Sequence, residues 1–227
     1  SSDWVNASVT IENSAPNNAT PYIFPNPAYS NSSLNASSLV QDVDNDVLKV
    51  EIVFWNGSRE HFRVNFSNIV NGSNISYTLI ENQTHNITKG ENWTAAFSVF
   101  DGNSSSGWTN TSIVINNTAP SPLNIIQNST WQEDTNLTNV TDLDEIFNDI
   151  DSDSITYSYS GGGAVNIIID SFNNLSYSPQ PNWYGTENVT ILANDGTSTG
   201  SSNLIFLTVT DTDETNPTIT VVSGKTK

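Results

Sequence analysis

Residues 48–66 read LKVEIVFWNGSREHFRVNF, and this stretch predicts a β-hairpin. Two runs of alternating apolar residues flank the pair Asn56-Gly57. An Asn-Gly pair between such runs is typical of a tight hairpin turn, because both residues accept the positive φ angles that the turn requires. The apolar residues of the second run share one face: Phe62, Val64 and Phe66. Since side chains alternate along a strand, we expect Arg63 and Asn65 to face solvent.

Similar signals continue along the chain. A second Asn-Gly pair, Asn71-Gly72, predicts another turn. Apolar and β-branched runs predict further strands over residues 155–159, 165–169, 189–193 and 204–209. Only residues 142–150 have room for a turn or two of helix. Short strands separated by turns at intervals of about ten residues predict an all-β sandwich fold.

The chain contains an internal repeat. Residues 1–16, SSDWVNASVTIENSAP, match residues 105–120, SSGWTNTSIVINNTAP, at an offset of 104. Self-similarity over such a distance predicts tandem modules. We expect one module over residues 13–118 and a second over residues 119–214. Each begins near an Asn-x-Ala-Pro stretch and carries a D-x-D-x-D cluster followed by an Asp-Gly turn.

Two short segments lie outside these modules. Residues 1–12 resemble the final strand of a module, and residues 215–227 resemble an orphan strand or the start of a further module. An isolated strand with an apolar face is not stable in water, so we expect the first segment to pair with another sheet. The residues of this assembly strand are Trp4, Val5, Ala7, Val9 and Ile11.

The composition excludes several classes of partner. The chain has 227 residues, with 24 acidic and 6 basic side chains and a formal net charge of -18. This balance argues against nucleic acid and anionic membranes as partners and favours divalent cations or basic surfaces. Cysteine is absent, which excludes disulfides and thiolate chemistry. We find no apolar run that could insert into a membrane and no signal peptide, so the sequence reads as a mature soluble chain or a piece of one.

Asparagine is the most informative residue type for the compartment. The sequence holds 19 Asn-x-Ser/Thr acceptor sites, more than its composition predicts by chance. Accidental occurrence in polar sequence is the alternative, but the pattern favours an exported protein with covalent N-glycans. The acceptor residues are Asn6, Asn18, Asn31, Asn35, Asn56, Asn65, Asn71, Asn74, Asn82, Asn86, Asn92, Asn103, Asn110, Asn116, Asn128, Asn136, Asn139, Asn174 and Asn188.

Two stretches of the second module resemble a known family. They read EDTNLTNVTDLDEIFNDIDSDSITYSYS from Glu133 and YSPQPNWYGTENVTILANDGTSTGSSNLIFLTV from Tyr177. Together they resemble the cadherin-like tandem modules of archaeal and bacterial surface proteins. The first module resembles a related immunoglobulin-like repeat, with Trp55 in the position of the buried core tryptophan. The resemblance implies two tandem β-sandwiches of the kind found in adhesins, surface layers and extracellular fibres.

The acidic clusters are candidate calcium sites. Carboxylates at alternate positions of a loop can converge on one cation, and Ca²⁺ takes six to eight oxygen ligands. The resemblance also implies calcium near module junctions. Turn formation, in which each aspartate accepts hydrogen bonds from its own backbone, is the alternative. The candidate ligands are Asp42, Asp44, Asp46, Asp101, Glu133, Asp134, Asp149, Asp151, Asp153, Asp195, Asp211 and Asp213.

Other chemistry has weaker support. The two histidines, His61 and His85, lack the neighbours of a catalytic triad or a zinc site. We therefore expect no enzymatic activity. Aromatic residues are candidates for a carbohydrate-binding face, with packing in the core as the alternative: Trp93, Trp108, Trp131 and Trp183.

These observations together predict a glycosylated structural subunit of an extracellular filament or surface lattice. Its partners would be copies of itself, joined head-to-tail by strand complementation. Two alternatives stay open, namely a stalk section of a longer adhesin and a calcium-dependent carbohydrate-binding module.

Overall fold

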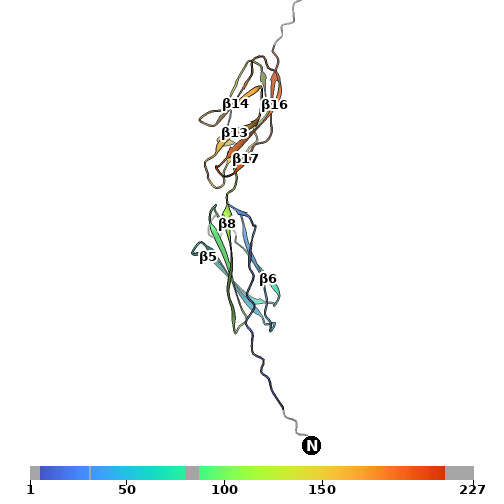
Figure 1. The fold of residues 1–227 in the computed structure, drawn as a ribbon, viewed down its shortest axis with the longest axis vertical. Helices are drawn as coiled ribbons and strands as arrows, with labels where there is room; N and C mark the ends of the chain where they lie inside the picture. The colour runs from blue at the N-terminus through green and yellow to red at the C-terminus, as the bar shows by residue number, and fades with distance from the viewer. Residues whose placement is uncertain (1–5, 31, 80–86, 213–227) are drawn as a thin grey trace, which may run out of the picture. The chain divides into compact units, whose positions relative to one another are not determined.

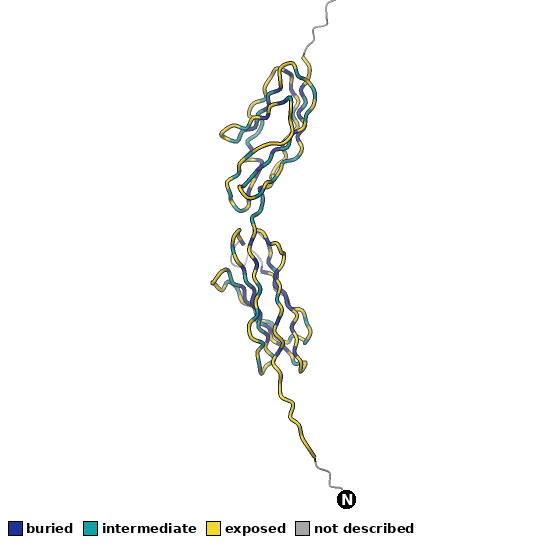
Figure 2. The backbone as a smooth tube through the Cα atoms, viewed as in Figure 1, coloured by how far each residue is buried: buried dark blue, intermediate teal, exposed yellow. Residues whose placement is uncertain are grey.

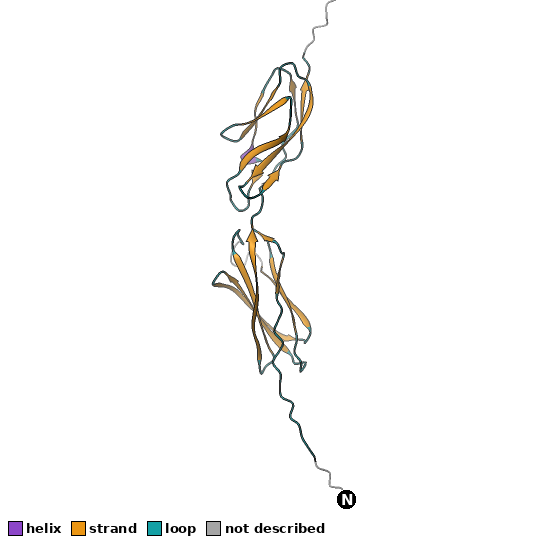
Figure 3. Cartoon of the chain, in the orientation of Figure 1, coloured by secondary structure: helices purple, strands orange, loops and turns teal. Residues whose placement is uncertain are grey.

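The computed structural model of the chain describes residues 6–30, 32–79 and 87–212. The chain divides into two compact units, Ser1–Thr118 (unit 1) and Ala119–Lys227 (unit 2), and strands provide nearly all of the regular structure in both (Figure 3). Among the described residues, no helix has the length and apolar character needed to cross a membrane. Some predicted features lie outside the described residues: Trp4, Val5, Asn31, Asn82, Asn86, Asp213 and the segment 215–227.

Unit 1 consists of two sheets (Figure 1). The smaller sheet has the strand order β1-β3-β6, with bounds Tyr22–Phe24, Leu34–Val40 and Ser73–Leu79. The larger sheet has the order β2-β8-β7-β4-β5, with bounds Ala28–Tyr29, Ser105–Asn116, Asn92–Phe100, Leu48–Asn56 and Arg59–Ile69. Neighbouring strands are antiparallel except for the parallel pair of β2 and β8. Two such sheets around one core form an immunoglobulin-like sandwich.

The predicted hairpin is confirmed as β4 and β5. They pair antiparallel, and Gly57 has a positive φ of 58° in the turn between them. The alternating residues of β5 pack against the core on one face, while Arg63 and Asn65 are exposed on the other. The turn at Asn71-Gly72 is confirmed as well, because Gly72 has a φ of 80° between β5 and β6.

The assignment of the core tryptophan was wrong. Trp55 is only half-buried, whereas Trp93 on β7 is fully buried and donates its indole N–H to Glu91 Oε2 over 2.9 Å. Val50, Ile52 and Phe54 share the core face of β4. Strand alternation therefore places the next residue, Trp55, on the opposite face.

Unit 2 is also a sandwich. One sheet has the order β10-β18-β16-β13, with bounds Ser129–Gln132, Ile205–Thr210, Gly185–Asn194 and Thr156–Gly161, and β17 (Thr199–Ser201) pairs with β16. The other has the order β11-β15-β14, with bounds Leu137–Asp142, Asn174–Pro179 and Val165–Ile169. A short pair joins β12 (Phe147–Asn148) and β9 (Ser121–Pro122). The four strands predicted between residues 155 and 209 are confirmed, and the predicted helical turn is the short 3-10 helix η2 (Leu143–Glu145).

The segment predicted as an N-terminal orphan strand is described from residue 6. Residues 6–12 belong to no sheet of the described chain and are exposed throughout (Figure 2). Val9 and Ile11 are each 88% exposed. At an offset of 104, their counterparts on β8 are Ile113 and Ile115, which are 8% and 1% exposed. The same apolar pattern is thus in the core in one copy and in solvent in the other.

Candidate functional site

Two loops bring acidic side chains together, one in each unit. In unit 1 the loop between β3 and β4 carries Asp42, Asp44 and Asp46. In unit 2 the loop between β12 and β13 carries Asp149, Asp151 and Asp153. Within each set, one carboxylate oxygen per residue lies within 4.8 Å of the others. Because calcium–oxygen distances are about 2.4 Å, ligands on one ion are at most about 4.8 Å apart, so each set can reach a single cation.

The first aspartate of the unit 1 loop uses its two oxygens differently. Asp42 Oδ1 accepts hydrogen bonds from the backbone N–H groups of Asp44 and Asp46, at 2.7 Å and 3.4 Å. These contacts are the turn-forming role that was the alternative to metal binding. Asp42 Oδ2 is buried and has no hydrogen-bond partner among the described residues. The residue as a whole is 5% exposed.

The unit 2 loop repeats this arrangement. Asp149 Oδ1 accepts from the N–H groups of Asp151 and Asp153, at 2.8 Å and 3.3 Å. Asp149 is 8% exposed, and its Oδ2 is likewise buried without a hydrogen-bond partner in the described chain. A buried carboxylate oxygen without a partner costs free energy, and here the cost recurs at equivalent positions of both units.

These donors fit a hard divalent cation. In the unit 1 loop the pKa of Asp46 is raised above its ordinary value. Burial is the first cause, and the negative charges of Asp42, Asp101 and Asp44 are the others, so the carboxylates of this loop repel one another. A cation would neutralise this repulsion and satisfy the free Oδ2 atom. Oxygen-only ligands of high negative charge suit Ca²⁺ rather than zinc or copper.

Asn71 holds the unit 1 loop in shape. Its Oδ1 accepts from the N–H of Asp42 at 2.8 Å, and its Nδ2 donates to the carbonyl of Asp42 at 2.7 Å and to Asn45 Oδ1 at 3.0 Å. Sequence reasoning assigned Asn71 as a glycan acceptor and missed this role. Its position in an Asn-Gly turn was the only signal, since nothing in the sequence pairs that turn with residues 42–45.

The segment that enters unit 1 contacts the same acidic region. The N–H of Ser14 donates to Asp44 Oδ2 at 2.5 Å, and Asn13 Nδ2 donates to Asp101 Oδ2 at 2.9 Å. The Asn13 hydrogen bond is the main reason why the pKa of Asp101 is lowered. Asp44 and Asp101 therefore anchor the residues that directly follow the exposed segment 6–12.

The remaining predicted acidic ligands have other contacts. Asp101 Oδ1 accepts from the N–H groups of Asn103 and Ser104, both at 2.6 Å, and Asp195 Oδ1 accepts from the equivalent groups of Thr197 and Ser198, at 2.6 Å and 2.7 Å. These are turn contacts.

A second acidic region of unit 2 is separate from the Asp149 loop. Glu133, Asp134 and Asp211 line one hollow there with Tyr184 and Thr212. The N–H of Thr212 donates to Glu133 Oε1 at 2.9 Å, and the N–H of Asn182 donates to Asp134 Oδ1 at the same distance. The predicted ligands therefore belong to separate places in the fold rather than to one site.

The predicted glycan acceptors fall into two groups by exposure. Most of the described ones are exposed: Asn6, Asn18, Asn65, Asn74, Asn92, Asn103, Asn110, Asn116, Asn128, Asn136, Asn139 and Asn188. The others are half-buried: Asn35, Asn56, Asn71 and Asn174. In each half-buried residue the amide nitrogen that would carry the sugar donates a hydrogen bond within the protein, to Thr78, Glu91, Asp42 and Asp170 respectively.

The candidate carbohydrate-binding tryptophans do not share one surface role. Trp93 and Trp131 are buried, at 0% and 8% exposure, and belong to the two cores. Trp183 is half-buried against the unit 2 core, and only Trp108 is exposed, at 52%. Core packing is thus the role of most of them. His61 is half-buried and meets the ring of Trp93 edge-on at 4.8 Å, while His85 lies outside the described residues.

No protein-family model matches the chain, and neither does any curated protein sequence. Several solved structures are similar to it over most of its length. The N-terminal Ig1-2 module of the Drosophila receptor protein tyrosine phosphatase DLAR has 8% identity and a TM-score of 0.29, with 84% of this chain and 98% of that chain covered. A chimeric titin Z1Z2 has 12% identity and a TM-score of 0.27, covering 86% and 98%. Domains 5-6 of the S-layer protein SbsC have 13% identity and a TM-score of 0.20, covering 85% and 100%. Scores and identities this low carry no inference about function.

Proposed function

We propose that the chain is a non-enzymatic structural section of an N-glycosylated extracellular protein, and that residues 3–12 pair as a strand with a sheet of another copy. Such a contact joins different surfaces of the two copies, so it does not close on itself and produces a filament or lattice. The high density of exposed Asn-x-Ser/Thr sites supports a location at the cell surface or outside the cell.

The proposal rests on one observation: the same apolar pattern occurs in residues 1–16 and in residues 105–120, but two of its side chains are exposed in the first segment and buried in the second. Ile113 and Ile115 are buried on β8, while Val9 and Ile11 are each 88% exposed. Burying two such side chains contributes roughly 3–6 kcal/mol. Association costs about 4–15 kcal/mol, so burial of the side chains alone offsets at most the low end of that range. Backbone hydrogen bonds along the strand must supply the remainder, which requires an open sheet edge.

Strand β5 offers such an edge. Among the described strands it ends the larger sheet of unit 1, and β4 is its one hydrogen-bonded neighbour. With 11 residues it is long enough to pair with the whole of residues 3–12. An exposed edge of this length favours pairing with another chain unless something covers it.

Sedimentation velocity over a range of concentrations tests the proposal. We expect the full chain to form larger species as its concentration rises, and the double variant Val9→Asp/Ile11→Asp to remain a monomer. The matched control is Ser8→Asp/Thr10→Asp, which adds the same charge to the opposite face of the segment and should still assemble. All three chains are produced without N-glycans, because Ser8→Asp removes the acceptor site Asn6-Ala7-Ser8. Equal assembly of both double variants would show that the apolar face is not the contact.

A stalk section of a longer adhesin is the alternative structural role. In that case residues 3–12 would close the sheet of a preceding module on the same polypeptide. A gene that extends far beyond this sequence, together with a chain that stays monomeric at every concentration, would favour the stalk.

We further propose that each unit binds one Ca²⁺ through its acidic loop, with Asp42, Asp44 and Asp46 as ligands in unit 1 and the corresponding aspartates in unit 2. The free Oδ2 atoms of Asp42 and Asp149 support this proposal. The ion would neutralise the clustered carboxylates and fix the loop that anchors Ser14. A calcium-dependent carbohydrate-binding module is less well supported, because two of its four candidate tryptophans are buried. Sugar affinity that disappears on chelation would revive it.

A further inference from the structure

The outer face of the larger sheet in unit 1 carries a small apolar patch of its own. Val53 on β4 and Ala96 on β7 are 1% and 8% exposed, although they belong to strand positions that face away from the main core. In the sheet register, Val53 pairs with Ala96 on one side and with Arg63 on the other, and Ala96 pairs with Asn110. The long side chains on this face therefore cover an apolar floor.

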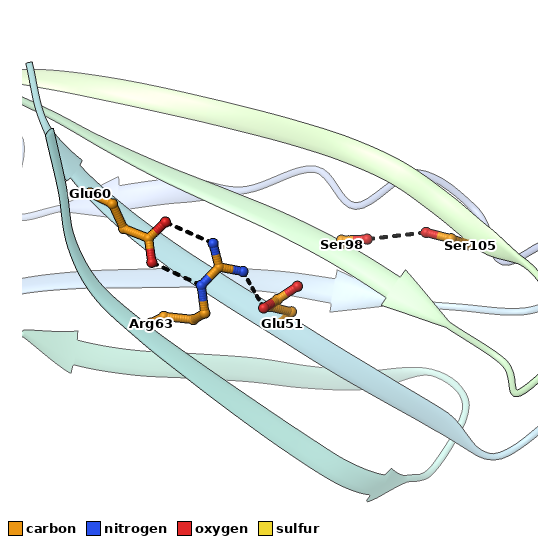
Figure 4. Close-up of polar contacts among 5 residues, drawn as sticks. All are labelled: Glu51, Glu60, Arg63, Ser98 and Ser105. Carbon is orange, nitrogen blue, oxygen red and sulfur yellow. Dashed lines mark hydrogen bonds and ion pairs between the residues drawn. The ribbon is translucent and has the colours of Figure 1, made fainter. Parts of the chain in front are cut away.

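Glu60 and Glu51 hold Arg63 in place on this face (Figure 4). Its guanidinium donates to Glu60 through Nε at 2.9 Å and through Nη2 at 2.8 Å, and its Nη1 forms a short ion pair with Glu51. The guanidinium carbon lies 5.9 Å from the centre of the Trp108 ring. These contacts give Trp108 a cationic neighbour that is itself fixed by two carboxylates.

Trp108 is 52% exposed and therefore presents a large aromatic surface to solvent. Asn110 follows two residues later on β8, so its side chain projects from the same face of the strand. It is exposed and belongs to the acceptor site Asn110-Thr111-Ser112. An exposed aromatic residue and a glycan acceptor are thus neighbours on β8, on this face of the sheet.

The same combination occurs independently in unit 2. Phe206 on β18 is 44% exposed and lies directly across from Asn188 on β16 in the antiparallel register. Asn188 is exposed and belongs to the acceptor site Asn188-Val189-Thr190. In this unit the aromatic residue comes from the neighbouring strand rather than from the same one, so the recurrence is not a copy of one sequence motif.

From this placement we infer that Trp108 and Phe206 are packing surfaces for the first sugars of N-glycans on Asn110 and Asn188. This inference rests on the proposed N-glycosylation. A pyranose ring has a face of C–H groups that packs on an aromatic ring, while its hydroxyl groups stay in water. The attached sugar would cover apolar area that otherwise faces solvent, and the ring would fix the direction in which the glycan leaves the sheet.

Glycans on this face would also limit which contacts it can make. A glycan that projects from this face at Asn110 on β8 keeps another protein from lying flat on the larger sheet of unit 1. Asn65, an exposed acceptor on the same face of β5, adds to this shielding. Contacts between copies would then use the strand edges, which a glycan projecting from the face leaves open.

A nuclear Overhauser measurement on the full chain produced with its N-glycans tests the inference. Glycopeptide mass spectrometry first establishes that Asn110 and Asn188 are occupied. We expect cross-peaks between the indole protons of Trp108 and the first sugar on Asn110, and between the Phe206 ring and the first sugar on Asn188. Occupied sites without these cross-peaks would overturn the inference and leave the proposed glycosylation intact. Vacant sites at 110 and 188, with glycans elsewhere, would also overturn it.

A stability cycle provides a second readout. Trp108→Ala should lower the equilibrium constant for folding of unit 1 about five-fold more in the glycosylated chain than in the Asn110→Gln background. A factor of this size lies within the range measured for contacts between aromatic rings. Tyr22→Ala is the matched control in the same unit, because Tyr22 is 53% exposed on β1 and pairs with Ser37 rather than with an acceptor asparagine. Its effect should be the same in both backgrounds. Equal losses for Trp108→Ala in both backgrounds would contradict the inference.

Discussion

At residue level, the two carboxylate oxygens of Asp42, and likewise those of Asp149, have different surroundings. One carboxylate oxygen shapes the loop by accepting two backbone N–H groups, and the other is buried without a hydrogen-bond partner in the described chain. The choice between turn formation and calcium binding is therefore a question about individual oxygens, which no sequence pattern resolves. The spacing of the aspartates predicted that they would converge. Their burial depends on the packing of loops that are distant in sequence.

Replacing one oxygen separates the two roles. Asp42→Asn and Asp149→Asn keep Oδ1 as an acceptor but replace the free oxygen with an amide. We expect each variant to retain its fold without metal and to lose the rise in melting temperature that calcium produces in its unit. Calorimetry with calcium and with chelator measures this effect.

Asp170→Asn is the control for that experiment. Asp170 Oδ1 accepts from the N–H groups of Phe172 and Asn174, yet the residue belongs to neither metal-compatible set. Its calcium response should equal that of the unaltered chain. A native chain that melts at the same temperature with and without calcium would remove the metal from both loops.

Tyr177 offers a test of a buried polar group in unit 2. Its side chain is fully buried, and its hydroxyl has no hydrogen-bond partner among the described residues. We expect Tyr177→Phe to stabilise unit 2 by about 1 kcal/mol, because it removes an unsatisfied group and keeps the ring that stacks on Trp131. Denaturant unfolding measures the difference. A loss of stability instead would mean that the hydroxyl has a partner, such as a bound water.

The same residue predicts a pH dependence. Burial raises the pKa of Tyr177 from its ordinary value of 10.0 to about 12. The folded state then holds its proton more tightly than the unfolded state, so this contribution to stability is complete below pH 10 and is lost as the pH rises toward 12. Tyr177→Phe should flatten the stability profile in this window. An unchanged alkaline slope would assign the effect to other groups.

At the level of strands and turns, the local sequence was a good guide wherever one pattern dominated. Asn56-Gly57 between two alternating runs gave the β4–β5 hairpin, and the face of β5 that packs on the core was read correctly. The family resemblance predicted the wrong core tryptophan, Trp55, whereas strand alternation along β4 predicts that Trp55 faces away from the core. Phe54 already occupies the core face, which excludes Trp55, and the residue that fills the centre, Trp93, comes from another strand.

Gly161 occupies a turn position that disfavours any side chain for two separate reasons, its positive φ angle and a close backbone neighbour. Its φ is 94°, and a Cβ atom there would lie 2.4 Å from the carbonyl oxygen of Asn188. Gly196 has a nearly identical φ of 93°, but a Cβ atom there would meet nothing within 4 Å. Both alanine variants introduce similar backbone strain, but only Gly161→Ala adds a steric clash. Gly161→Ala should therefore be the more destabilising of the two by about 1–3 kcal/mol. Denaturant unfolding of both variants measures this difference, and equal losses would contradict the close approach of Asn188.

For the molecule as a whole, the structure divides the glycan acceptors in a way that the sequence could not. The motif Asn-x-Ser/Thr is the same in each, but exposure and hydrogen bonding differ. We expect glycopeptide mass spectrometry to find sugar on exposed acceptors such as Asn110 and Asn188 and none on Asn71 or Asn174. The last two are half-buried, and their Nδ2 atoms donate to Asp42 and Asp170. Full occupancy of Asn71 would show that its loop opens before the sugar is attached.

Amide hydrogen exchange of residues 6–12 in the assembled material addresses the proposed assembly. In a dilute solution of the chain these amides should exchange as fast as those of an unstructured peptide, since the segment belongs to no sheet of the described chain. In concentrated, assembled protein we expect alternate amides of the segment to be protected as strongly as those of β8, because a newly formed edge strand donates every second N–H to its neighbour. Fast exchange of the whole segment in assembled material would contradict strand pairing between copies.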